Sequence, residues 1–268
     1  MRKSNRITVG ILADILKRAG KEIVLPAYAS VVVSSGKADG SIVTETDLSC
    51  QSCIQAELAK LDDAIAFIGE EMTEEEQLAC LRNSNGSYWC LDPLDGTTNF
   101  ATNLPGFALS LALIENGLVE LACIYDPVRD ELFTAIRGGG AALNGNPITA
   151  SAETRLANAV GYIDFKRLDR NRAISLACDK SYRSQRNLGS CALEWAWLAA
   201  GRGQFIVHGG EKVWDFSAGS LIAAEAGCVI GDFEGRPFFP AAKLSSPVLA
   251  ACSAPIHASL ILQLGHMN

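Results

Sequence analysis

The stretch FALSLALIENGLVELACIYDP, residues 107–127, restricts the fold more than any other part of the sequence. Two apolar runs of strand length flank Asn116–Gly117, and Asn-Gly is the strongest short signal for a tight β-hairpin. The next segment, ELFTAIRGGGAALNGNPI, continues with short apolar runs and turns rich in glycine and asparagine. We therefore predict antiparallel β-structure in this part of the chain.

From about residue 150 the pattern changes to alternating strands and helices. The strand signals are ANAVGYI, YRSQRNLG, GQFIVHG, AGCVIGDF and PVLAACS, and the helix signals are CALEWAWLAAG, DFSAGSLIAAEAG and PIHASLILQLG. The sequence shows neither an internal repeat nor a linker. We predict an α/β protein (α+β in some schemes) with two apposed subdomains, residues 1–148 and 149–268.

Upstream of the hairpin, apolar spacing predicts one long helix over residues 6–33, or two helices broken at Pro26. A second helix is expected over residues 47–61, with Asp47 as its N-cap. The segment AIAFIGEE predicts a strand, and the polar residues 72–86 predict a mobile connection. A further strand, SYWCLD, ends at Asp92.

Composition limits the classes of function. Of the 268 residues 49% are hydrophobic, which predicts a folded core, and the formal net charge of −7 argues against a basic nucleic-acid-binding face. Charges interrupt the apolar N-terminal stretch, and no uncharged run is long enough to span a membrane, so we expect neither a signal peptide nor a transmembrane helix. Nine scattered cysteines predict reduced thiols in a cytoplasmic protein, with Cys50 and Cys53 in packing roles.

The stretch CLDPLDGTTNF, residues 90–100, places Asp92 and Asp95 around a proline at the end of a strand. Gly96 allows close backbone approach, and the Thr-Thr-Asn run suits a helix N-terminus, where free N–H groups can bind phosphate. Two carboxylates and a carbonyl in one turn can hold a hard divalent cation. An Asx-type turn that caps a helix would fit the same letters, so both interpretations stay open on this stretch alone.

Spacing excludes several better-known sites. An EF-hand needs acids at alternate positions and a glutamate at position twelve, whereas these acids are three apart. Aspartyl-phosphate phosphatases have one residue between their acids, and here there are two. The glycine-rich residues 138–145 lack the lysine of a P-loop, and the three histidines are too dispersed to suggest a metal cluster.

Three more short patterns are ambiguous when each is taken alone. Glu70 and Glu71 follow an apolar strand, where both could be a solvated strand end, and for Glu71 that is the better interpretation. Asp215 follows Trp214 at the start of a helix, where an aspartate is a good N-cap. The segment GKADGSIVTETD sets Lys37, Thr44 and Asp47 on a turn and a helix start.

Taken together and in this order, the motifs resemble the inositol monophosphatase family of Mg²⁺-dependent, lithium-sensitive sugar phosphatases. The matching segments are VTETD at Val43, GEE at Gly69, DPLDGTTNF at Asp92 and WDFSAG at Trp214, and the resemblance covers essentially the whole chain. It implies a layered α-β-α-β-α sandwich and a homodimer.

The resemblance also implies a set of ligands for two or three Mg²⁺ ions. Glu70, Asp92 and the Leu94 carbonyl would hold the first ion. Asp92, Asp95 and Asp215 would hold the second, and Glu70 would help a looser third. The set contains only oxygen ligands, which favours Mg²⁺ or Mn²⁺ over zinc.

By the same resemblance, Asp47, Glu70 and Thr97 would be catalytic, with the Asp47–Thr97 pair positioning a water for direct attack on a phosphate monoester. The backbone N–H groups of Gly96 and Thr97 would bind phosphate oxygens. The implied substrate-binding residues are Asp95, Gly96, Thr97, Arg186, Gly189, Ser190, Cys191, His208 and Asp215.

The chain departs from the family pattern around the substrate. Ser41 replaces the usual aspartate of the first loop. His208 stands where the animal inositol enzymes have a glutamate that binds inositol hydroxyls, and Arg186 matches a basic position of bacterial members. These departures weaken a strict assignment to inositol-1-phosphate and leave the phosphatase assignment intact.

The expected substrate is inositol-1-phosphate or a related small phosphorylated polyol or sugar. Fructose 1,6-bisphosphate, 3′-phosphoadenosine 5′-phosphate and histidinol phosphate are the alternatives that relatives use. From another class, some bacterial relatives act as regulatory partners in ribosomal RNA transcription, and that function is the second hypothesis.

Overall fold

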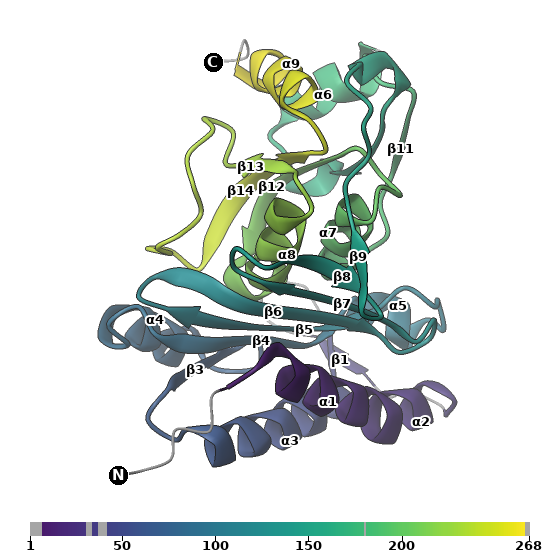
Figure 1. Cartoon of the computed structure of the whole chain (residues 1–268). Helices are drawn as coiled ribbons and strands as arrows, with labels where there is room; N and C mark the ends of the chain where they lie inside the picture. The colour runs from purple at the N-terminus through teal and green to yellow at the C-terminus, as the bar shows by residue number, and fades with distance from the viewer. Residues whose placement is uncertain (1–6, 31–33, 37–41, 180, 266–268) are drawn as a thin grey trace.

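The computed structural model describes residues 7–30, 34–36, 42–179 and 181–265. Figure 1 shows helices and two large sheets stacked in alternating layers. The first helical layer holds α1 (Val9–Ala19), α2 (Leu25–Tyr28) and α3 (Glu45–Leu61). Helices α7 (Cys191–Ala199) and α8 (Val213–Glu225) lie between the sheets, and α6 (Arg170–Cys178) and α9 (Ala254–Gly265) form the outer layer. This arrangement confirms the predicted layered α-β-α-β-α sandwich.

The first sheet has seven strands in chain order. They are β3 (Ala66–Gly69), β4 (Tyr88–Asp95), β5 (Ala108–Glu115), β6 (Leu118–Asp126), β7 (Glu131–Ile136), β8 (Gly140–Leu143) and β9 (Asn146–Ile148). Only β3 and β4 pair in parallel. The hairpin prediction is confirmed, since Asn116 and Gly117 join β5 to β6 with φ of 53° and 76°, the left-handed values that a type I′ turn needs.

The second sheet has the order β11 (Ser184–Arg186), β10 (Val160–Asp164), β12 (Phe205–Lys212), β14 (Ser245–Ala251) and β13 (Val229–Gly231). Each strand overlaps a segment that the sequence predicts as a strand, and β10, β12 and β14 extend beyond their predicted segments. Helices α7, α8 and α9 were also predicted, whereas α6 was not. A two-stranded sheet pairs β1 (Ser34–Gly36) with β2 (Ile42–Thr44).

The helices that precede β4 confirm one prediction and differ from two others. Helical structure continues from Val9 to Tyr28 through a π-helical turn, so Pro26 does not break it and the alternative of one long helix holds. Thr44, not Asp47, is the N-cap of α3; Asp47 occupies the third helical position, and its Oδ2 accepts from the Thr44 N–H at 2.8 Å. The expected mobile connection contains α4 (Glu74–Asn83), which a capping box of Thr73 and Glu76 starts.

The seven-stranded sheet is buried on both faces. Along β4, Tyr88 and Cys90 belong to the cluster of buried residues that includes α7 and α8, while Trp89 and Leu91 belong to the cluster with α1 and α3. Burial on both sides explains why the strands are continuous apolar runs. The last strand of the seven-stranded sheet ends at Ile148, and the next strand belongs to the second sheet. The cluster of buried residues around α7 and α8 includes residues of both sheets. The division into two subdomains therefore stays a prediction.

None of the helices in the described ranges is long and apolar enough to cross a bilayer. All nine cysteines are free, and most are buried or partly buried. The predicted cytoplasmic location stays a prediction.

Candidate active site

A bulge in β4 brings the two aspartates of the opening motif together. Residues three apart on a regular strand point to opposite faces of a sheet. The partners of Asp92 and Asp95 on β5 are Ser110 and Ala108, so three steps along β4 oppose two along β5. This extra residue turns Asp95 to the face of Asp92, which is the face that packs against α8. The strand therefore runs on through the predicted turn to Asp95.

Helix α8 supplies the third carboxylate. Asp215 lies in its first turn, and one of its oxygens accepts from the N–H of Lys212 at 2.9 Å. Lys212 is the N-cap, so the expectation that Asp215 would cap the helix is wrong by three residues. Carboxylate oxygens of Asp92, Asp95 and Asp215 lie within 4.8 Å of one another, although 123 residues separate Asp92 from Asp215 in the chain.

Glu70 stands beside this cluster. It follows β3, the parallel neighbour of β4, and its N–H donates to the carbonyl of Leu91 at 3.1 Å. Its negative charge helps to raise the pKa values of both Asp92 and Asp215. The structure thus brings together all four carboxylates that the resemblance names as cation ligands.

The cluster concentrates negative charge in a poorly solvated place. Burial, followed by repulsion from Glu70, Asp95 and Asp215, raises the pKa of Asp92 well above its ordinary value. Burial and then repulsion from Asp95 do the same for Asp215. Burial raises the pKa of Asp95 to about 6, against hydrogen bonds from Ser190 and Ala192 that lower it. A divalent cation would relieve this repulsion, and the all-oxygen donor set fits Mg²⁺, Mn²⁺ or Ca²⁺.

Asp47 and Thr97 form a pair next to the cluster. The Thr97 hydroxyl lies 2.9 Å from Oδ1 of Asp47 and 3.1 Å from the carbonyl oxygen of Leu94. The other oxygen of Asp47 accepts from the N–H and the hydroxyl of Thr44, so the carboxylate is fixed on both sides. Burial raises the pKa of Asp47 against these hydrogen bonds. The pair can hold one proton at a defined position.

The predicted substrate segment meets the acidic loop. The Ser190 hydroxyl and the Ala192 N–H, the latter at 2.7 Å, donate to one oxygen of Asp95. Asn99 donates to the carbonyls of Gly106 and Leu188 at 2.6 Å each, which ties the two loops together. Gly96 has φ of 92°, and a Cβ there would lie 2.7 Å from the Gly106 carbonyl oxygen, so this crossing requires glycine.

The remaining predicted substrate residues differ in how closely they approach the acids. Gly189 and Cys191 lie in the segment that contacts Asp95. Burial, and then repulsion from nearby acids such as Glu211, raise the pKa of the Cys191 thiol. Arg186 is exposed and donates to its own strand, at the Gln185 carbonyl and the Ser184 hydroxyl. His208 is buried, accepts from the Gly210 N–H and lies 3.5 Å from Asp164.

The substrate-binding roles of Arg186 and His208 stay predictions. Lys37 and Ser41, from the first loop, lie outside the described residues.

Sequence reasoning missed Glu211, a fully buried carboxyl group at the end of β12. One oxygen accepts from the Trp195 indole N–H at 2.8 Å, and the other has no hydrogen-bond partner among the described residues. Burial, and then repulsion from Asp95 and Asp164, raise its pKa to about 8. A second bulge lies between His208 and Glu211. The Gly209–Gly210 pair at the end of the predicted strand GQFIVHG was the available clue.

Glu211→Gln is expected to make the fold less sensitive to pH. The pKa of Glu211 is 4.5 in an unfolded chain and about 8 in the folded state, so only the folded state keeps the proton between these values. Wild-type stability therefore falls as the pH rises through this window, and the variant escapes that loss. The difference in free energy of unfolding should reach on the order of 2–4 kcal/mol in favour of the variant at pH 8.

Urea unfolding in EDTA at pH 5, 6.5 and 8 measures this difference. Glu75→Gln, at an exposed position of α4, is the matched control and should show a constant offset. If the difference in free energy of unfolding between Glu211→Gln and wild type were the same at all three pH values, the raised pKa of Glu211 would be contradicted.

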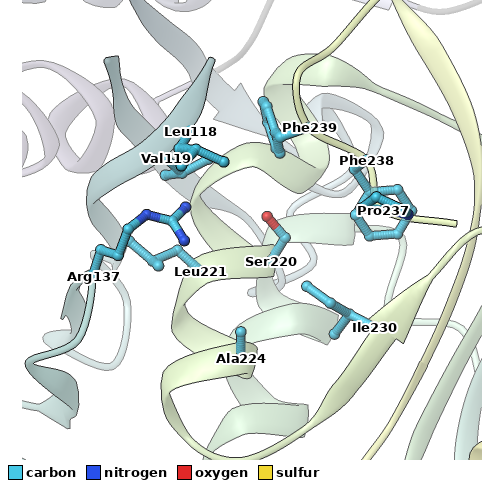
Figure 2. A pocket seen from close by; sticks show the side chains of 10 residues that line it. All are labelled: Leu118, Val119, Arg137, Ser220, Leu221, Ala224, Ile230, Pro237, Phe238 and Phe239. Carbon is cyan, nitrogen blue, oxygen red and sulfur yellow. The ribbon is translucent and has the colours of Figure 1, made fainter. Parts of the chain in front are cut away.

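A cavity of about 170 Å³ lies away from the acids. Figure 2 shows it between β6, α8 and the segment before β14, with Leu221, Phe238 and Phe239 on its walls and Arg137 at one side. It touches α8 at residues 220–224, whereas Asp215 lies in the first turn of that helix. The cavity therefore takes no part in the candidate site.

Two layered sheets with a buried all-oxygen cluster at a strand end define a class of α/β proteins suited to cation-dependent chemistry. A family model described as the inositol monophosphatase family matches residues 9–264. The chain belongs to this family.

Relatives and solved structures agree with the family assignment. Inositol monophosphatase 1 of Solanum lycopersicum is 35% identical over 239 residues, which cover 86% of each chain. Nus factor SuhB of Escherichia coli (strain K12) is 36% identical over 209 residues, or 76% of each chain. The structure of an IMPase from Thermotoga maritima is similar with a TM-score of 0.84 and 30% identity, over 96% of both chains.

Proposed function

We propose that the protein is a Mg²⁺-dependent phosphate monoester hydrolase that acts on inositol-1-phosphate or a related small sugar phosphate. The observation that carries the proposal is the meeting of Asp92, Asp95 and Asp215 within 4.8 Å in a chain of this family. Such a cluster is unfavourable without a cation and becomes an anion-binding site with one. That change explains how a chain of net charge −7 would bind a phosphate.

The cation ligands that we assign follow the donor set of the site. Glu70, Asp92 and the Leu94 carbonyl would hold one Mg²⁺, and Asp92, Asp95 and Asp215 a second, with Glu70 also serving a looser third. Mn²⁺ would fit the same oxygens. When bound, the cations would lower the pKa of a coordinated water and neutralise charge on the phosphate.

The remaining residues would orient the reactants and handle the proton. Asp47 accepts the Thr97 hydroxyl at 2.9 Å, so the threonine oxygen can accept a proton from the attacking water while its own proton passes to Asp47. The backbone N–H groups of Gly96 and Thr97 would bind the phosphate oxygens. Ser190 holds Asp95 in place from the substrate side.

The substrate class rests on the residues around Cys191, His208 and Arg186. The name of the tomato relative supports inositol monophosphate as the substrate. His208 and Cys191 depart from the family pattern, so other polyol phosphates are compatible with the site. Fructose 1,6-bisphosphate, 3′-phosphoadenosine 5′-phosphate and histidinol phosphate are the alternatives. A homodimer and inhibition by lithium belong to the same proposal.

Phosphate release from a substrate panel tests the proposed function. The panel contains inositol-1-phosphate and the three alternatives, each with Mg²⁺ and with EDTA. We expect Mg²⁺-dependent release that is fastest with inositol-1-phosphate. Release from none of the compounds would reject the phosphatase proposal, and a clear preference for another compound would reject the named substrate.

The second candidate function is a regulatory role in ribosomal RNA transcription, favoured by the similarity to the Escherichia coli Nus factor. Under this hypothesis an Asp215→Asn protein without activity would still bind RNA polymerase or Nus factors in a pull-down. Loss of function in cells that parallels loss of phosphatase activity would argue against it.

A further inference from the structure

The turn that carries Glu70 is held from two sides by buried glutamines. Gln77 comes from α4 and Gln51 from α3, and they are 4% and 8% exposed. The turn itself, residues 69–72, links β3 to α4. Buried amides are found where their hydrogen bonds are satisfied, and here the partners are the backbone groups around Glu70.

Gln77 provides the larger share of the contacts. Its side-chain amide nitrogen donates to the carbonyls of Gly69 at 2.9 Å, Glu70 at 3.2 Å and Met72 at 3.2 Å. The turn therefore wraps around one NH₂ group, and the capping box of Thr73 and Glu76 fixes the helix that carries it. Without this donor, three carbonyls would lose a partner in a place that is largely closed to water.

Gln51 closes the turn from the opposite helix. Its carbonyl oxygen accepts from the N–H of Glu71 at 3.1 Å. It also lies so close to Gly69 that a Cβ there would be 2.1 Å from it, so a larger residue at this position would displace the Gln51 amide. The Glu70 N–H also donates to the Leu91 carbonyl on β4. Hydrogen bonds from α3, α4 and β4 therefore fix the backbone of the turn, residues 69–72.

We propose that Gln77, assisted by Gln51, is a positioning residue that sets the Glu70 carboxylate toward Asp92 for cation binding. The inference rests on the proposed function for the role of Glu70. Residues that orient metal ligands typically contribute 10- to 100-fold in metal affinity. Helix α4, expected from the sequence to be a mobile connection, is on this view part of the cation site.

The test is the affinity of Gln77→Met for Mn²⁺, measured by the EPR signal of the free ion and independent of turnover. Methionine keeps the length and the helix propensity but removes the amide donors. We expect the dissociation constant to rise about 10-fold or more, with kcat at saturating cation changing less than about threefold. Gln55→Met, at an exposed position of α3, is the matched control and should bind as wild type does.

A structural role alone would lower the thermal midpoint of Gln77→Met and leave the dissociation constant unchanged, and that result would overturn the proposal. If Gln77→Met fails to fold, Gln51→Met provides the same test with a smaller expected rise of about three- to tenfold. An unchanged constant there would also overturn it. Wild-type protein that binds Mn²⁺ but releases no phosphate would reject the proposed function and leave this inference standing.

Discussion

Asp92→Asn is expected to lower kcat for phosphate release by at least about 10³-fold, because Asp92 is the one residue that the proposal assigns to both main cation sites. Asparagine has nearly the same shape but offers one neutral oxygen in place of a charged carboxylate. Its carbonyl can still accept the Leu94 N–H, which lies 3.0 Å from Oδ1 of Asp92, so the local backbone should survive. Phosphate release with Mg²⁺ measures the loss.

The same substitution should stabilise the metal-free protein. Asp92 is 1% exposed, and burial with repulsion from three neighbouring acids holds its pKa well above the ordinary value. Removing this charge removes a cost that the fold bears only for function. We expect a higher Tm than wild type in EDTA, which also shows that the activity loss is not an unfolding effect.

Asp63→Asn, at an exposed position after α3, is the control and should leave both activity and Tm unchanged. Asp215→Asn should behave as Asp92→Asn does. Near-normal activity of either folded variant would remove the residue from the assigned ligand set.

The sequence predicts the elements of this fold well where the signal is local. The Asn116–Gly117 turn, the strands of the second sheet and helices α7 to α9 all follow from short-range patterns. Helix α4 was missed because its first turn and its flanks are polar and its apolar residues form one short run. Leu78, Cys80 and Leu81 of this run pack against the core while only partly buried, and Gln77 is the one buried residue of the helix. It forms through its capping box and its contacts with the Glu70 turn, and these contacts depend on the rest of the structure.

The site was predictable as a set of residues but not as a geometry. Spacing alone would put Asp92 and Asp95 on opposite faces of a strand, and the bulge that brings them together depends on pairing with β5. Both Asp47 and Asp215 were expected as N-caps and instead lie at the third helical position. An acid at the N-cap or at the third helical position can accept a hydrogen bond from a backbone N–H at the helix start. The sequence therefore does not distinguish the two positions.

Removing divalent cations is expected to make the fold less stable as the pH rises from 5 to 8. The folded-state pKa of Asp95 is raised from 3.8 to about 6, and burial and repulsion raise the pKa values of Asp92 and Asp215 well above their ordinary values. In this range the folded state holds more protons than the unfolded chain does. Stability therefore falls with pH, by up to about 1.4 kcal/mol per pH unit for each such group until its folded pKa is passed.

Mg²⁺ should counteract this trend, because it binds the ionised carboxylates and competes with protons. Binding at about 100 times the dissociation constant adds about 2.7 kcal/mol, which for a chain of this size raises Tm by roughly 5–10 °C. The rise in Tm from EDTA to Mg²⁺ should be near zero at pH 5 and largest at pH 8, as measured by thermal unfolding. A rise that is independent of pH would contradict the assignment of the cluster as the cation site.

The comparison between EDTA and Mg²⁺ separates the cluster from the other buried acids. Burial also raises the pKa values of Glu194 and Glu211, but neither is an assigned cation ligand. Burial, the largest cause of both shifts, acts in both titrations and cancels in the difference, while the smaller repulsion from Asp95 does not cancel. In Asp92→Asn the difference itself should shrink strongly, because the variant lacks the carboxylate that the proposal assigns to both main cation sites.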